Sequence, residues 1–416
     1  MTGTEYLWII TGIILFGYVL SEILNWLNLS HSKTALPPEA EGIYDDEQYA
    51  KSQKYQRVTA RFSFITAAFS TIITVAFLWL GGFGWLDKWL TAYADNEIWL
   101  ALAFFGVLSI ASDIINLPFQ LYSTFVIEEK YGFNKTTLKT FFLDKLKGYL
   151  LGAILGGGVL AILIYLVLLL GTNFWLVFWV AITLIMVIMN MFYTSLILPL
   201  FNKLTPLEEG SLRQAIEAYS SKVGFPLTNI YVIDGSKRSS KANAFFSGLG
   251  KKKKVVLYDT LIEKQKEEEL VAIFAHEVGH YKKRHIQLGL VLSVLQTGIM
   301  LFVLSLMIFN VQLSEALGAG SMKIHLNLIA FGILYSPISM ITGLFMNLIS
   351  RKNEFEADRY AVNTASGENL AQALKKLSSD NLSNLLPHPA YVYVNYSHPP
   401  LLTRLAAINA AVAEEA

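Results

Sequence analysis

One group of residues in this sequence has the types and the spacing of a zinc-dependent hydrolase. His276, Glu277 and His280 form the pattern H-E-x-x-H. On a helix, residues four apart share a face, so both imidazoles can bind one zinc ion, and the adjacent carboxylate can take a proton from the attacking water. Residues 270–275 are all apolar, which favours a mostly buried helix over 267–284, where unpaired imidazoles would be costly. The pattern therefore predicts one zinc ion per chain, with Glu277 as general base.

A third ligand must come from elsewhere, because a catalytic zinc site uses three protein ligands and leaves one position open. The chain has no cysteine, so a histidine or a carboxylate must supply this ligand. Glu354 and Asp358 lie four residues apart and share one face of a predicted helix. One of them can bind zinc, and the other can accept the free N–H of a ligand imidazole. Glu356 is expected to point away from the site.

Among the five other histidines, one belongs to a candidate site. His398 and Arg404 can stabilise an oxyanion if they lie near zinc, although a loop-capping role fits the same segment equally well. His285 is expected to be a surface residue at the membrane interface. The other three are expected in loops, without a role: His31, His325 and His388.

The elements that must position these residues are mostly membrane helices. Of 416 residues, 54% are hydrophobic and 16% are charged, whereas soluble domains carry roughly 25% charge. The formal net charge of +1 offers no electrostatic footprint for nucleic acid. Apolar runs long enough to span a bilayer lie near residues 5–27, 62–86, 98–127, 149–170, 173–201, 287–310 and 326–349.

The third run, 98–127, is unusually long for a simple span. Thirty helical residues reach about 45 Å, well beyond the ~30 Å hydrocarbon core. The run also contains Asp113, with Asn116 and Gln120 close by. Such a carboxylate either faces the bundle interior or water, or it makes a structural hydrogen bond between helices.

Lysine and arginine in the loops predict the orientation of the chain. Loops 28–61 and 128–148 carry five basic residues each, whereas loops 87–97 and 311–325 carry one each and the turn 171–172 carries none. The positive-inside rule therefore predicts an N-terminus outside and a C-terminus in the cytosol. The last two spans then form a hairpin that returns both halves of the zinc site to the cytosolic side.

The domain organisation follows from this topology. Short β-rich runs and helical spacing between residues 202 and 286 predict a small α+β unit there. We expect four segments: 1–201 with spans one to five and their cytosolic loops, 202–286 as the cytosolic peptidase segment, 287–349 with spans six and seven, and 350–416 as a cytosolic tail that packs on the peptidase segment.

The chain resembles the type 1 CAAX prenyl proteases, which are integral-membrane zinc metallopeptidases, along nearly its whole length. The motifs that carry this resemblance lie at residues 117–119, 122–129, 132–137, 198–201, 204–207, 243–245, 256–261, 276–280, 354–358 and 398–400. The resemblance implies a mainly α-helical fold. Seven tilted transmembrane helices would enclose a water-filled chamber, capped on the cytosolic side by a small α+β zinc peptidase domain of the gluzincin type.

The resemblance also implies roles for individual residues. Zinc would be bound by His276, His280 and Glu354, which leaves Asp358 as the partner of a ligand imidazole. An edge strand would pair with the substrate backbone, and this strand contains Asn243, Ala244 and Phe245. His398 and Arg404 would contact the scissile carbonyl or the peptide near the metal.

We therefore predict a zinc-dependent membrane endopeptidase that cleaves peptides or proteins, prenylated or not, near their C-terminus. One alternative is an HtpX-like protease for membrane-protein quality control or signal-peptide degradation. Another is a transporter or scaffold with structural zinc. Besides the substrate and the lipid bilayer, no obligate partner and no nucleic acid is expected. The expected location is the bacterial inner membrane, or the endoplasmic reticulum membrane in a eukaryote.

Overall fold

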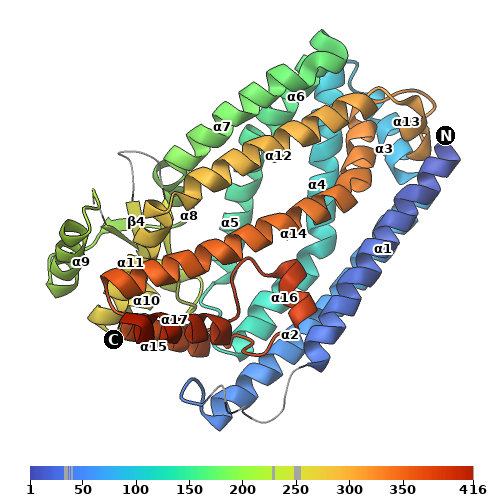
Figure 1. Cartoon of the computed structure of the whole chain (residues 1–416). Helices are drawn as coiled ribbons and strands as arrows, with labels where there is room; N and C mark the ends of the chain where they lie inside the picture. The colour runs from blue at the N-terminus through green and yellow to red at the C-terminus, as the bar shows by residue number, and fades with distance from the viewer. Residues whose placement is uncertain (32–35, 37, 39–40, 227–229, 248–253, 416) are drawn as a thin grey trace.

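The structure is a computed structural model that describes residues 1–31, 36, 38, 41–226, 230–247 and 254–415. In Figure 1 the strands and several short helices gather at one end of a set of long helices. The long helices are α1 (Gly3–Ser30), α2 (Asp46–Trp79), α4 (Glu97–Tyr122), α5 (Leu138–Leu151), α6 (Gly157–Leu170), α7 (Phe174–Leu196), α12 (His285–Met307) and α14 (Ile324–Thr364).

Six helical segments among the described residues are long and apolar enough to cross a membrane. One of them, Leu138–Phe201, contains α5, α6 and α7. Gly171, with φ of +55°, opens a short turn through Asn173, after which α7 packs back against α6 (Figure 1). This segment therefore supplies two passes, and the segments together supply the seven predicted spans.

The spanning helices are splayed rather than packed into a solid bundle. In the most apolar window of each segment, only 6% to 22% of the residues are buried inside the chain. Neighbouring spans pack in pairs, such as α1 with α2 and α7 with α12, and their other apolar residues can face lipid.

The long third span is confirmed, and its carboxylate joins two helices. α4 continues into a π-helical stretch, Ser123–Glu128, so the segment has 32 residues. The Asp113 carboxylate of α4 accepts hydrogen bonds from Lys145 Nζ of α5, at 2.6 and 2.7 Å, and from Gln120 Nε2, at 3.1 Å. The structural bond between helices is therefore observed, and the Asp113 side chain also stays 23% exposed.

A small mixed sheet lies at the end of the molecule that holds the zinc motif. In the part of the chain that the structure describes, four strands are ordered β1-β2-β4-β3. The β2–β4 pair is parallel, and the β1–β2 and β3–β4 pairs are antiparallel. The strands are β1 (Leu204–Pro206), β2 (Ile230–Ile233), β3 (Ala244–Ser247) and β4 (Lys254–Tyr258). The predicted edge strand is thus β3, with one side open.

Short helices complete both ends of the molecule. α3 (Gly82–Thr91) and α13 (Val311–Ala316) lie at the end where α1 begins (Figure 1). The helices at or toward the other end are α8 (Leu198–Phe201), α9 (Ser211–Lys222), α10 (Asp259–Lys264), α11 (Glu267–Lys282), α15 (Gly367–Asp380), α16 (Pro389–Asn395) and α17 (Leu401–Glu415).

The hydrophobic core at this end is built around α11. Phe274 of α11 is fully buried and belongs to one hydrophobic cluster with side chains of α9, α14, α15 and α17, which include Ile216, Ala361, Leu370 and Ile408. Leu257 of β4 belongs to the same cluster. Residues from both sides of the last membrane hairpin therefore share one core, and this core holds α11 and the polar end of α14 in place.

Candidate active site

The helix that carries the zinc motif is well defined at both ends. At its start, the backbone N–H of Lys266 donates to the Glu269 carboxylate at 2.8 Å, and acidic residues in the first turn interact favourably with the helix dipole. At its end, Arg284 adopts a left-handed conformation with φ of 60°. The chain then turns directly into α12, so the metal motif is tied to a membrane span by one short turn.

Close packing of α11 on α14 brings the two halves of the site together. Gly279 lies within the zinc motif, and a Cβ there would come within 3.0 to 3.1 Å of the Cα and carbonyl oxygen of Ala357. Ala357 is itself fully buried. A larger residue at either position would separate the helices, so these small residues set the distance between the imidazoles of α11 and the carboxylates of α14.

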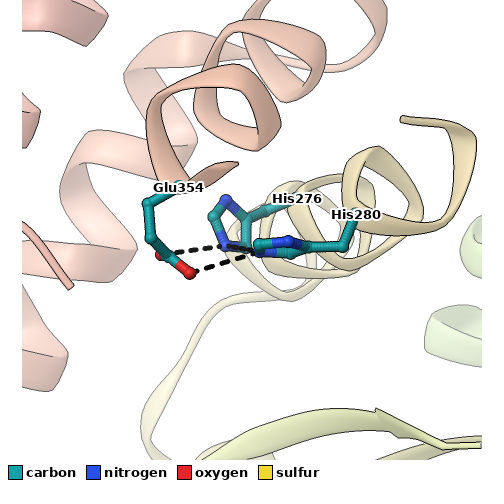
Figure 2. A group of neighbouring side chains, drawn as sticks. All are labelled: His276, His280 and Glu354. Atoms are coloured by element: carbon teal, nitrogen blue, oxygen red, sulfur yellow. Dashed lines mark hydrogen bonds and ion pairs between the residues drawn. The ribbon is translucent and has the colours of Figure 1, made fainter. Parts of the chain in front are cut away.

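The predicted ligands converge on one point (Figure 2). His276 Nε2 and His280 Nε2 lie 3.1 Å apart. Glu354 Oε2 lies 3.5 Å from His276 Nε2, and Glu354 Oε1 lies 3.4 Å from His280 Nε2. Ligands about 2.0–2.1 Å from a tetrahedral zinc ion would lie roughly 3.3 Å from one another. Two imidazoles and one carboxylate with this spacing fit zinc, with one position left open.

Asp358 lies where a partner for a ligand imidazole is needed. Its Oδ1 lies 2.9 Å from His276 Nδ1, so it can accept the N–H and direct the lone pair of Nε2 toward the metal. Arg404 donates hydrogen bonds to both Asp358 oxygens, from Nε to Oδ2 at 2.8 Å and from Nη2 to Oδ1 at 2.6 Å. Arg404 Nη1 also lies 3.4 Å from Glu354 Oε2. The single positive charge of the guanidinium is thus shared between two buried carboxylates.

A cavity of about 630 Å³ opens beside the ligands. One wall is the edge of the sheet, with Ala244 and Phe245 of β3 and with Asn243, which the sequence placed in this strand but which lies immediately before it. An apolar part of the lining belongs to the spans α12 and α14, with residues such as Leu292 and Met346. The cavity therefore joins a strand edge, a metal site and the interior faces of two membrane helices.

Glu277 and His398 also line this cavity. Burial raises the pKa of the Glu277 carboxyl, which makes its ionised form a stronger base. The His398 side chain is 65% exposed, and its Nε2 lies 3.3 Å from Glu354 Oε1. His398 is therefore at the rim, where a bound peptide can reach it, whereas Arg404 is buried behind the ligands.

The expectation that His285 is a surface residue is wrong. His285 is 7% exposed, and its Nδ1 lies 3.0 Å from His280 Nδ1. Its Nε2 lies 3.2 Å from Glu356 Oε2, so Glu356 does point away from the metal. One signal for this was available: each ligand imidazole needs an acceptor for its second N–H, and Asp358 can serve one of the two.

The loop expectation for His325 is also wrong. His325 lies at the start of α14, is fully buried, and bonds through Nε2 to Asp87 Oδ1 of α3 at 2.9 Å. Helix α3 lies at the end of the molecule opposite α11 (Figure 1). His388 caps the start of α16, and its ring packs edge-on against His31, with centroids 5.4 Å apart.

Zinc binding to the metal-free chain is expected to tighten as pH rises. Burial lowers the pKa of His276, but hydrogen bonds to Asp358 and Glu354 raise it by more, to about 9. Zinc requires the neutral imidazole, so binding below pH 9 must displace this proton. The zinc affinity should therefore fall about tenfold for each unit by which the pH is lowered below 9. Chelator competition at pH 6.5, 7.5 and 8.5 measures this. Affinity that is independent of pH would contradict it, and Asp358→Asn should weaken the dependence.

Two known family profiles match successive parts of this chain. The profile for the five-helix N-terminal membrane region of CAAX prenyl proteases matches residues 25–203, and the profile of peptidase family M48 matches residues 206–412.

Similar proteins cover nearly the full length. A CAAX prenyl protease 1 homolog of Arabidopsis thaliana is 36% identical over 413 residues, with 96% of each chain covered. CAAX prenyl protease 1 of Saccharomyces cerevisiae is 34% identical, covering 91% of this chain and 89% of its own. A human CAAX prenyl protease 1 homolog is 32% identical, covering 90% and 89%. The crystal structure of S. mikatae Ste24p superposes with a TM-score of 0.93 at 32% identity, over 97% of this chain and 99% of that one.

Proposed function

Because the chain belongs to peptidase family M48 and is similar over nearly its whole length to CAAX prenyl proteases, we propose that it is a zinc-dependent protease of prenylated C-terminal sequences. It is a multi-pass membrane metalloendopeptidase. The observation that carries the proposal is the convergence of two imidazoles and a carboxylate beside a cavity with one strand wall and one apolar membrane-helix wall.

The proposed chemistry divides between the metal and Glu277. Zinc held by His276, His280 and Glu354 would polarise the scissile carbonyl and acidify the attacking water. A carboxylate oxygen of Glu277, which is not among the ligands, takes the proton of that water and delivers it to the leaving amine. Asp358 holds the His276 ring in the tautomer that leaves Nε2 free.

The peptide is proposed to bind along β3. Among the described residues, β3 is an edge strand whose single strand partner is β4, so the backbone groups on its other side can pair with an extended substrate. Asn243, Ala244 and Phe245 line the cavity at this edge. His398 at the rim is proposed to contact the carbonyl or the peptide close to the metal.

The prenyl group is proposed to lie against the apolar wall formed by α12 and α14.

The chain is proposed to have its N-terminus outside and its C-terminus in the cytosol. It is proposed to consist of four segments, divided after residues 201, 286 and 349. The boundary between the two profile matches, at 203–206, supports the first division. The membrane is proposed to be a bacterial inner membrane or, in a eukaryote, that of the endoplasmic reticulum.

The full chain in lipid should cleave a farnesylated CAAX peptide with kcat/KM at least about tenfold above that for the same peptide without the lipid. Burial of as few as two additional methylene groups, at about 0.8 kcal/mol each, is enough for this ratio. A chelator should stop cleavage, and added zinc should restore it.

The same assay separates the alternatives. Equal rates for both peptides would contradict prenyl recognition and favour a quality-control protease. Loss of the folded cytosolic end on chelation, followed by circular dichroism, would favour structural zinc, because such sites contribute to folding directly.

A further inference from the structure

A row of three side chains leads away from the metal site: His280 of α11, His285 of α12 and Glu356 of α14. His280 Nδ1 lies 3.0 Å from His285 Nδ1, and His285 Nε2 lies 3.2 Å from Glu356 Oε2. The His285 side chain is 6% exposed and that of Glu356 is 38% exposed. The catalytic steps described above use neither His285 nor Glu356.

The chemistry of these groups determines where the protons lie. An ionised carboxylate can only accept hydrogen bonds, so His285 Nε2 carries a hydrogen atom and donates a hydrogen bond to Glu356. Neutral His285 then has its lone pair at Nδ1, and His280 Nδ1–H donates to it. His280 is left with its lone pair at Nε2, the atom 3.1 Å from His276 Nε2 in the ligand group. The row therefore selects the tautomer of His280 that a metal requires.

The two ligand imidazoles are supported differently. His276 faces Asp358, a carboxylate held by the buried Arg404. His280 faces a neutral ring whose own orientation depends on one partly exposed carboxylate. A turn at Arg284 with φ of 60° places His285 beside His280, so the support for His280 comes from the start of a membrane span.

We propose that His285 is a positioning residue for the ligand His280, and that Glu356 holds His285 in the tautomer that accepts from His280. The inference rests on the proposed metal site and extends it to two residues outside the group of metal ligands.

The test measures the zinc affinity of the full chain, after metal removal, by competition with a chromophoric chelator. His285→Ala should weaken zinc binding about 10- to 100-fold, and Glu356→Ala should weaken it less. Glu356→Gln keeps an acceptor oxygen and should restore most of the affinity. In the double variant, loss of Glu356 should add nothing to His285→Ala, because Glu356 acts through His285.

Lys352→Ala is the matched control, because Lys352 also forms an ion pair with Glu356, with 3.7 Å between Nζ and Oε1. The Lys352 side chain is 76% exposed. Zinc affinity should not change. The visible spectrum of the cobalt-substituted protein should shift in Glu356→Ala at unchanged melting temperature, which a merely structural role would not produce.

The outcomes separate this inference from the proposed function. A wild-type chain that binds no stoichiometric zinc would refute the proposed metal site. A wild-type chain that binds one zinc, with His285→Ala binding equally tightly or with the two substitutions additive, would overturn the role of His285. If His285→Ala does not fold, unchanged affinity in Glu356→Ala would overturn it alone.

Discussion

Glu277→Gln is expected to lower kcat about 100- to 10,000-fold while zinc stays bound at one ion per chain. The size follows from the usual contribution of general acid–base catalysis. Glutamine has nearly the shape of glutamate but cannot accept the proton of the attacking water. Zinc should remain, because the cluster of possible ligands consists of His276, His280 and Glu354. Peptide cleavage and metal content measured on one preparation test both parts.

Glu268→Gln is the matched control for this experiment, because Glu268 lies on the same helix, α11, and is exposed. Its activity should equal that of the wild type. If Glu277→Gln bound zinc and cleaved peptide as fast as the wild type, Glu277 would not be the general base, and the mechanism would need another proton acceptor in the cavity.

The parts of the fold and site that depend on local patterns could be predicted from the sequence. Apolar length is a local property, so the run 287–310 anticipated α12 at His285–Met307. The two i, i+4 pairs anticipated the ligand faces of α11 and α14, because helical periodicity alone places such residues together. The end of α14 could not be predicted from the apolar run 326–349. The helix continues to Thr364, because many of the polar residues that follow this run are still good helix formers.

The contacts that depend on tertiary packing could not be predicted. His285 is buried because the turn at Arg284 folds α12 back toward α14, and no property of the sequence near His285 reports that turn. His325 finds Asp87 only because α3 packs against the start of α14. For Arg404, the sequence identified a residue near the metal but not its partner, Asp358, which lies 46 positions away. That partner changes what Arg404 is expected to do.

Arg404→Met is expected to destabilise the metal-free chain by about 3 to 5 kcal/mol, the usual cost of removing one partner from a buried ion pair. The substitution leaves the Glu354 and Asp358 carboxylates, 4% and 2% exposed, without the guanidinium that lies between them. A bound divalent cation would offset part of this negative charge, so the loss of stability should be smaller with zinc. Thermal unfolding with and without zinc measures the difference.

Two further variants make the Arg404 prediction specific. Arg404→Lys keeps the charge but cannot grip both Asp358 oxygens, so it should recover only part of the stability. Arg359→Met removes an ion pair with Glu414 in which both side chains are 62% exposed, and it should change stability by less than about 1 kcal/mol. If Arg404→Met instead leaves the melting temperature unchanged and raises only KM, Arg404 contacts the peptide rather than supporting Asp358. The alternative in which it contacts the scissile carbonyl predicts a fall in kcat at unchanged stability, so the three measurements together assign its role.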